Sequence, residues 1–328
     1  MYLARRKVAA PDGPDHRIIV SSDPGSGLWS DVRTVARLRL ERGGATATAA
    51  AQLAAAAVPA SMTAALELGD AFWDSARHAL ESTSGDGLVA DPVLGCPVDP
   101  AYFRDFMVFE EHFSSGYKWQ GKEVPRVLYD FPISYMGNAS AVFGPGDTIP
   151  CPGYTDELDI ELELGIVLAR TARDVRPDTA LDCVAGVTIL NDFSARDIQR
   201  EEMAALLGPS KGKHFATAIG PWIATLDEIP ESGLRMRAVV DGEEWTDANS
   251  GEMIWDLAEI VAWASSGEVV PPGAVLGTGT CNGGSGLEIG KRLKPGSRVR
   301  LDVDRLGRLE NRIGLPAEVW RPASKYRS

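Results

Sequence analysis

The chain has 328 residues, 44% hydrophobic and 24% charged, so it is an ordinary globular sequence with enough length for two domains. Its formal net charge of -13 argues against nucleic acids and anionic membranes as partners. The four cysteines are widely spaced, which argues against a zinc knuckle or a disulfide framework, and neither a signal-peptide core nor a bilayer-length apolar run is present, so we expect a cytoplasmic protein.

The first hundred residues differ in composition from the rest. They are rich in alanine from Gly43 to about Ser82, and the spacing of apolar residues from Thr63 to Leu80 predicts one or two helices. No motif in this region is typical of a chemical site. We expect residues 1–100 to form a smaller, partly helical N-terminal domain or arm, with a boundary marked by the turn-forming Gly95, Pro97 and Pro100.

Residues 101–328 read as short strands separated by Gly and Pro turns, with occasional helices. The expected strands are Leu158–Leu168, Gly186–Asn191, Arg235–Val240, Ala274–Gly277 and Ser297–Val303, and the expected helices are Ser194–Leu207 and Met253–Ala264. This pattern predicts an α+β fold with a mixed sheet. It lacks both the regular βαβ alternation and the glycine motif of a nucleotide-binding sheet.

The first motif lies in the segment from Phe103 to His112. Asp105 and His112 are seven residues apart, which places them two turns apart on one face if the segment is helical. One could ligate a metal while the other acts as a base, because His is the usual general base near neutral pH. The alternative is that His112 is a structural residue.

The second motif is the strand-like run from Asp159 to Leu168. Side chains in a strand alternate between faces, so Glu161 and Glu163 share one face with Asp159, and apolar side chains occupy the other. Neighbouring carboxylates repel one another, and a hard divalent cation with oxygen ligands would relieve that repulsion. The alternative is the solvated outer face of an edge strand.

A third carboxylate position follows the apolar run that ends at Leu190. Asp192 stands where this predicted strand passes into the helix expected from Ser194 onward. Functional carboxylates often lie at strand ends, so Asp192 is a candidate site residue. The alternative is that Asp192 or Ser194 only caps the helix.

Two further segments could act on a substrate. Lys213 offers a cation that could hold a developing oxyanion, the alternative being a solvated surface lysine. The glycine-rich loop from Gly277 to Glu288 could bring backbone amides close to a ligand, the alternative being a plain flexible turn.

Together these motifs resemble the fumarylacetoacetate hydrolase family, in family order, from about Tyr102 to Ile313. The resemblance implies a metal site with one Mg²⁺ or Mn²⁺, a catalytic histidine oriented by a glutamate, an active-site lysine and several substrate contacts. The implied ligands are Asp105, Glu161, Glu163 and Asp192, the implied catalytic residues are His112, Glu288 and Lys213, and the implied substrate contacts are Gln199, Tyr135 and Thr278.

The resemblance also implies a mixed β-sheet roll or barrel of the fumarylacetoacetase C-terminal type, a homodimer, and a small 2-oxo acid or 1,3-dicarbonyl substrate. The leading hypothesis is a catabolic hydrolase that cleaves a carbon–carbon bond in an acylpyruvate-like or fumarylacetoacetate-like compound. A metal-dependent decarboxylase, isomerase or tautomerase is the alternative, and a silent binding protein with a structural cation is a third. Met107 stands where the family has a tyrosine, so the substrate's second carboxylate clamp departs from the family pattern.

Overall fold

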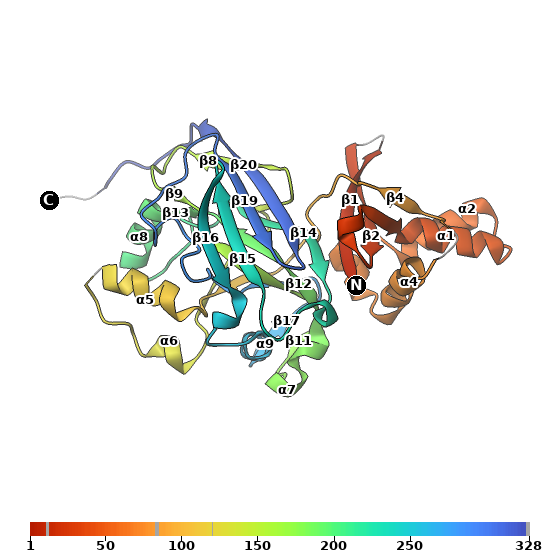
Figure 1. The fold of residues 1–328 in the computed structure, drawn as a ribbon, viewed down its shortest axis with the longest axis horizontal. Helices are drawn as coiled ribbons and strands as arrows, with labels where there is room; N and C mark the ends of the chain where they lie inside the picture. Colours follow the sequence, from red (N-terminus) through yellow and green to blue (C-terminus); the bar gives the residue numbers. More distant parts are fainter. Residues whose placement is uncertain (11–12, 83–84, 120, 326–328) are drawn as a thin grey trace.

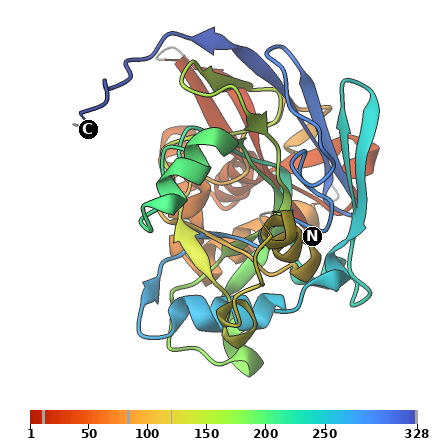
Figure 2. The ribbon, with the colours of Figure 1, turned by 90° about the vertical axis from the view of Figure 1, so that its left-hand side faces the viewer.

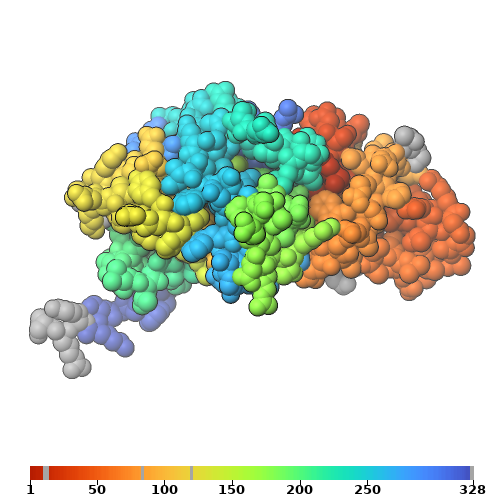
Figure 3. All heavy atoms as spheres, turned by 90° about the horizontal axis from the view of Figure 1, so that it is seen from below, coloured from red at the N-terminus to blue at the C-terminus, as the bar shows by residue number. Residues whose placement is uncertain are grey.

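The computed structural model describes residues 1–10, 13–82, 85–119 and 121–325. A smaller part built from the first ninety or so residues lies beside a larger part built from the rest (Figure 1). One sheet runs through both parts, because β1 (Tyr2–Ala10) pairs antiparallel with β14 (Thr217–Ala224). The chain after the last strand extends away from the body (Figure 3). Among the described residues, no helix has the length and apolar character needed to cross a membrane.

The smaller part combines antiparallel strands with four helices among its described residues. Its strands are β1, β2 (Gly13–Ser21), β3 (Leu28–Asp31) and β4 (Leu88–Ala90), and its helices are α1 (Val32–Arg42), α2 (Ala47–Ala57), α3 (Met62–Glu67) and α4 (Asp70–Leu80). Helices α3 and α4 lie where the apolar spacing predicts them. The strands were not anticipated, because the basic run in β1 hides its alternation. Those basic side chains are ion-paired: Arg6 lies 2.8 Å from Asp31, and Lys7 lies 2.8 Å from Asp147.

The larger sheet has the strand order β4-β3-β2-β1-β14-β12-β10-β18-β5-β6, and a short strand β7 pairs parallel with β14. The remaining strands of this sheet are β5 (Phe103–Phe106), β6 (Ser134–Met136), β7 (Val142–Phe143), β10 (Leu162–Leu168), β12 (Val184–Asp192) and β18 (Val275–Gly277). Strand β10 lies between β12 and β18. All of its residues are buried, so both faces of the sheet are covered at this point.

A second sheet has the order β16-β15-β19-β20-β8. Its strands are β8 (Thr148–Pro152), β15 (Arg235–Val240), β16 (Glu243–Asn249), β19 (Arg298–Val303) and β20 (Gly307–Ala317). Strands β15 and β19 bury alternate residues, the pattern of a sheet with one face on a core. Those buried residues join one hydrophobic cluster with Leu164 and Ile166 of β10. The result is a mixed α+β fold with two large sheets, and the sheets do not close into a barrel.

Helices cover the ends and faces of these sheets. They are α5 (Glu110–Trp119), α6 (Val127–Asp130), α7 (Pro177–Ala180), α8 (Arg196–Ala204) and α9 (Leu257–Ser265). Two small two-stranded sheets pair β9 (Leu158–Asp159) with β13 (Ser194–Ala195), and β11 (Ala172–Arg173) with β17 (Val269–Val270). Helices α5 and α8 lie at the end of the molecule remote from the smaller part (Figures 1 and 2). A capping box of Asp256 and Glu259 starts α9, so this helix begins four residues after the expected start at Met253.

Several expected elements need correction. The segment from Asp105 to His112 is not one helix, because Asp105 belongs to β5 and only His112 lies in α5. Hydrogen bonding of β5 to β18 and β6 overrides any local helical preference. The expected long strand from Leu158 is divided into β9 and β10. Neither Asp192 nor Ser194 caps α8, whose N-cap residue is Ala195.

Candidate active site

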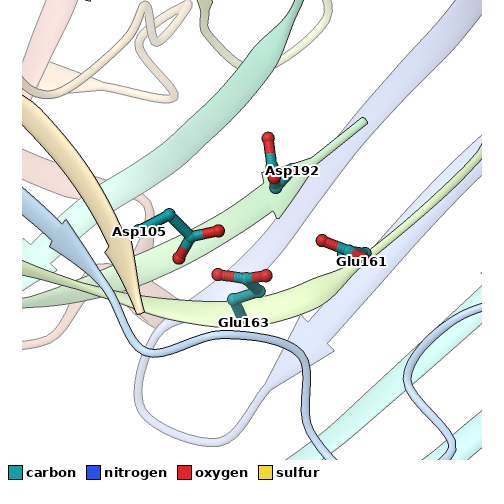
Figure 4. Close-up of side chains that lie close together, drawn as sticks. All are labelled: Asp105, Glu161, Glu163 and Asp192. Atoms are coloured by element: carbon teal, nitrogen blue, oxygen red, sulfur yellow. The ribbon is translucent and has the colours of Figure 1, made fainter. Parts of the chain in front are cut away.

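Four buried carboxylates meet inside the larger part. Asp105 lies on β5, Glu163 on β10, and Asp192 at the end of β12, while Glu161 directly precedes β10. One oxygen of each lies within 4.8 Å of one oxygen of every other. Figure 4 shows the four side chains pointing toward one another. The residues predicted as ligands therefore converge at one point, which we call the carboxylate cluster.

The strand order explains this convergence. Strand β18 pairs with β5, which places Gly277 opposite Asp105, and it pairs on its other side with β10. Strand β12 pairs with β10 on the opposite edge, with Asn191 opposite Leu162. Because β10 is a central strand, the face that carries Glu163 is interior, and the alternative of a solvated edge-strand face is wrong. Asp159 does not join the cluster.

Glu161 and Asp192 form the half of the cluster that faces cations. Lys213 Nζ contacts Glu161 and lies 2.6 Å from Asp192 Oδ2, while Arg196 Nη1 lies 2.7 Å from Glu161 Oε1. Burial favours a raised pKa for Glu161, but Lys213 and Arg196 outweigh it and hold that pKa below its ordinary value. Burial favours a lowered pKa for Lys213, yet Asp192 and Glu161 raise it, so the lysine keeps its charge. The alternative of a surface lysine is wrong, since Lys213 is buried.

Asp105 and Glu163 form the other half, and neither makes an ion pair with a described residue. Burial, followed by the charge of Asp192, raises the pKa of Asp105 well above its ordinary value. Burial, followed by the charge of Asp105, does the same to the pKa of Glu163. Glu163 Oε2 accepts a hydrogen bond from the Gly279 N–H at 3.1 Å, but Asp105 Oδ1 has no hydrogen-bond partner among the described residues.

The space beside these two carboxylates depends on a glycine. A Cβ atom at Gly277 would lie 2.2 Å from Asp105 Oδ1 and 3.0 Å from Glu163 Oε2. A side chain at this position would push the two carboxylates out of place. The glycine is therefore needed for close approach of the backbone, a stronger role than that of a flexible turn.

The donor set suits a hard divalent cation. All members of the cluster offer carboxylate oxygen, which is the ligand type of Mg²⁺ and Mn²⁺, and the cluster has no thiolate or imidazole ligand among the described residues. The orphaned oxygen of Asp105 is a buried polar atom that a bound cation would satisfy. The residues present therefore fit the metal that the sequence predicts.

A histidine and a glutamate lie at the edge of the cluster, because Ser285 forms a β-bridge with Glu161 and its hydroxyl donates to Glu288. His112 Nδ1 is 2.9 Å from Glu288 Oε2, and both side chains are largely buried. Glu288 also accepts hydrogen bonds from the N–H groups of Gly283 and Ser285 and from the Ser285 hydroxyl. Burial opposes ionisation of Glu288, but His112 and these donors lower its pKa, so it stays a carboxylate. Its contact with Nδ1 leaves Nε2 as the ring nitrogen of His112 that Glu288 does not bind.

Lys213 is held by its own loop. The Glu202 carboxylate of α8 accepts hydrogen bonds from the N–H groups of Ser210, Lys211 and Gly212, at 2.7 to 3.0 Å, and from the Ser210 hydroxyl. One side chain thus fixes the turn that delivers Lys213 to the cluster. Sequence reasoning missed Glu202, because nothing in its local pattern distinguishes it from a surface helix residue.

The predicted substrate contacts have different surroundings. Tyr135 donates from its hydroxyl to Asp192 Oδ2 at 2.5 Å, and burial followed by the Asp192 charge raises the pKa of Tyr135 well above its ordinary value. The Oε1 atom of Gln199 accepts a hydrogen bond from Arg196 at 3.0 Å, one helical turn along α8. Both residues therefore adjoin the groups that hold the cluster.

The hydroxyl of Thr278 does not bind the cluster. Its hydroxyl accepts a hydrogen bond from the Leu164 N–H at 3.2 Å and donates to the Gly279 carbonyl at 3.1 Å, so the main chain occupies it. The hydroxyl of Thr280 instead lies 3.4 Å from Glu163 Oε1. The geometry favours Thr280 as the threonine that borders the cluster, a residue that the loop's repeated Gly-Thr pattern did not single out.

Comparison with known proteins places this geometry in a family. A model of the fumarylacetoacetate (FAA) hydrolase C-terminal region matches residues 102–314. Proteins from Burkholderia ambifaria and Burkholderia lata are each 38% identical over 181 residues, 54% of this chain, and carry provisional hydrolase names that state no substrate. The match spans 63% of the length of those relatives.

Solved structures share the fold over most of the chain. A 5-carboxymethyl-2-hydroxymuconate delta-isomerase from Mycobacterium smegmatis superposes with a TM-score of 0.66 at 22% identity, covering 96% of this chain and 100% of that one. A maleylpyruvate hydrolase from a Sphingobium strain superposes with a TM-score of 0.68 at 21% identity, again covering 96% and 100%. With the family match to two thirds of the residues, the carboxylate cluster and the strand order lead to one conclusion: the chain belongs to the fumarylacetoacetate hydrolase family.

Proposed function

We propose that this protein is a divalent-cation-dependent hydrolase that cleaves a carbon–carbon bond in an acylpyruvate-like 1,3-dicarbonyl compound. The observation that carries the proposal is the His112–Glu288 pair, 2.9 Å between Nδ1 and Oε2, at the edge of the carboxylate cluster. A structural cation site would not need a histidine whose free nitrogen is oriented by a glutamate. The provisional hydrolase names of the Burkholderia relatives support the same reaction class.

The residues present can perform each proton transfer. When bound, Mg²⁺ or Mn²⁺ would act as a Lewis acid toward two neighbouring oxygens of the substrate. His112 takes a proton from water at Nε2, and the hydroxide attacks the distal carbonyl carbon. The bond between that carbon and the adjacent carbon then breaks, the electron pair stays with the departing carbon, and His112 returns the proton to it. The products are two acids, one of them a 2-oxo acid.

Two side chains could stabilise the oxyanion that forms during attack. Lys213 keeps its charge because Asp192 and Glu161 raise its pKa, and Gln199 is tied to the cluster through Arg196. One such donor commonly contributes about 3 kcal/mol to transition-state stabilisation. Tyr135, next to Asp192, is a further candidate contact for the substrate.

An isomerase or decarboxylase that uses the same cluster is the second candidate, favoured by the isomerase among the similar structures. Such a reaction moves a proton or releases carbon dioxide without a water nucleophile. The His112–Glu288 pair would then not be needed to activate water.

The test is turnover of a panel of acylpyruvates, followed by loss of their enol absorbance, with Mg²⁺, with Mn²⁺ and with chelator. Cation-dependent release of pyruvate and a second acid would support the hydrolase. If the panel is untouched while oxaloacetate-type acids lose carbon dioxide or interconvert tautomers, the hydrolase proposal fails and the second candidate replaces it.

The homodimer implied by the family resemblance stays a prediction. Leu206 and Leu207, at the end of α8, are each about nine-tenths exposed, and a partner chain could cover them. Light scattering coupled to gel filtration measures the mass directly. A monomer mass at working concentrations would contradict the expectation.

A further inference from the structure

Asp159 lies next to the carboxylate cluster without belonging to it. Its side chain is buried, at the end of β9. Asp159 Oδ2 accepts a hydrogen bond from Arg196 Nε at 2.8 Å. Asp159 Oδ1 accepts one from the Gly286 N–H at 2.7 Å, and Oδ2 accepts another from the Leu287 N–H at 3.0 Å. One carboxylate therefore binds a helix side chain and the glycine-rich loop together.

One of these partners contacts the carboxylate cluster, and the other adjoins the Glu288–His112 pair. Arg196 continues to Glu161, whose Oε1 lies 2.7 Å from Arg196 Nη1. Leu287 directly precedes Glu288, which holds His112. A shift of Asp159 would move both the cluster and the histidine, although Asp159 touches neither.

We propose that Asp159 is a positioning residue that holds Glu161 ready for the cation and Glu288 ready for His112. Asp159 affects Glu161 by occupying one edge of the Arg196 guanidinium. Without Asp159, the guanidinium can turn fully onto Glu161 and compete with the cation for its oxygens. Asp159 affects Glu288 by anchoring the loop one residue before it. The second effect rests on the proposed function, whereas the first concerns cation binding alone.

The first test compares Asp159→Asn with the wild-type protein. The variant keeps the size of the side chain but places an amide against Arg196. Mn²⁺ affinity, measured by the electron paramagnetic resonance signal of free Mn²⁺, should fall roughly 10- to 100-fold, and kcat at saturating Mn²⁺ should fall by a similar factor.

Asp31→Asn is the matched control. Asp31 is also buried, accepts Arg6 at 2.8 Å, and accepts the Thr34 N–H at 2.9 Å, but it lies in the smaller part of the chain. Its variant should lose thermal stability while keeping Mn²⁺ affinity and kcat within about twofold. If Asp159→Asn binds Mn²⁺ as tightly as wild type, the proposal is overturned, even if no substrate in the acylpyruvate panel is turned over.

A second variant uses the cavity beside Asp159. A cavity of about 210 Å³ borders Asp159, Arg196 and Leu287 and reaches the surface at Arg200 and Arg292. Formate could enter it and replace the carboxylate that Asp159→Gly removes. Added formate should then restore part of the lost Mn²⁺ affinity in this variant, with wild type in the same buffer as the control.

Rescue by formate separates positioning from general damage to the fold, which an added anion would not repair. If Asp159→Gly is folded by circular dichroism but formate restores none of its affinity, the positioning role is refuted. If neither variant folds, Asp159→Glu, which keeps the charge but moves it by one methylene, must still bind Mn²⁺ more weakly than wild type; equal affinity would overturn the proposal.

Discussion

In the smaller part of the molecule the buried Asp31 forms an ion pair with one cation, Arg6. In the larger part, the buried carboxylates of the cluster are more numerous than the cations that pair with them. Asp31 receives Arg6 at 2.8 Å and the Thr34 N–H at the start of α1. The carboxylate cluster has four acids, and among the described residues its ion pairs are made by two cations, Lys213 and Arg196. Arg196 is moreover shared with Asp159.

The difference separates a structural carboxylate from a functional one. A buried acid that serves the fold is paired where it lies, because an unpaired buried charge is costly. The cluster instead leaves Asp105 and Glu163 with raised pKa values and one oxygen of Asp105 without a partner among the described residues. A divalent cation would supply the positive charge that the cluster lacks.

The largest expected effect concerns the base beside the cluster. His112→Ala should lower kcat about 10²- to 10⁴-fold, the usual contribution of a general base, while Mn²⁺ affinity stays near that of wild type. Steady-state turnover and Mn²⁺ titration measure the two quantities. His78→Ala, on the exposed face of α4, is the control and should change neither. Unchanged kcat in the His112 variant would contradict the hydrolase and favour decarboxylation or isomerisation.

The next effect tests the space that the cluster needs. Gly277→Ala places a Cβ 2.2 Å from Asp105 Oδ1, so Asp105 must move, and turnover should fall about 10²-fold along with weaker Mn²⁺ binding. Gly116→Ala, in α5, is the control because, apart from its chain neighbours and the backbone of its own helix, no described atom lies within 4 Å of a Cβ there. Normal Mn²⁺ binding by the Gly277 variant would show that Asp105 is not a ligand.

Stability should change in opposite directions in the two regions. In chelator, Glu163→Gln should raise Tm by a few degrees, because it removes a buried carboxyl group whose ionisation is opposed by burial and by the charge of Asp105. Asp31→Asn should lower stability by about 2 kcal/mol, since it loses hydrogen bonds to a charged partner.

Mn²⁺ at about 100 times its Kd should stabilise the wild type by about 2.7 kcal/mol, and the Glu163 variant by clearly less. Differential scanning calorimetry with and without Mn²⁺ measures all three proteins. If Mn²⁺ does not change the Tm of the wild type, the cluster does not bind the cation, and the proposed difference between the two regions is wrong.

The smallest effect concerns a carboxylate that neutral donors satisfy. Burial favours a raised pKa for Glu202, but the N–H groups of Gly212, Ser210 and Lys211 lower that pKa below its ordinary 4.5. A lowered folded-state pKa gives stability that is present above the unfolded-state pKa and is lost as pH falls through the folded-state value. The Tm advantage of wild type over Glu202→Gln should therefore shrink as pH falls below 4.5. A difference that does not change with pH would contradict this assignment.

Much of the site could be predicted from local pattern. Alternation in a strand places Glu161 and Glu163 on one side, and the apolar run before Asp192 predicts a strand end there. The condition that would place Asp105 and His112 on one helical face is not met, because strand pairing by β18 and β6 decides the conformation of Asp105. Asp105 and His112 do not need to share a helix for their proposed roles, since β5 positions the first and α5 positions the second.

Other residues could not be found from the sequence. Thr278 and Thr280 stand in the same Gly-Thr repeat, and only their hydrogen bonds distinguish them. Asp159 looks like a third member of the acidic row, yet its partners are Arg196 and a loop more than 120 residues away. Contacts over such separations depend on how the sheets pack, which no local pattern encodes.

The sequence by itself determined which chemical groups are available, because residue types and their periodicity decide which groups can share a face and which ligands they offer. It also carried the order of motifs that marks the family. Only the tertiary structure decided burial and charge balance: that Lys213 is interior, that Asp105 lacks a partner, and that Asp159 links Arg196 to the loop before Glu288. Burial and pairing are set by strands and helices distant in the chain, and their energies arise when those elements pack together.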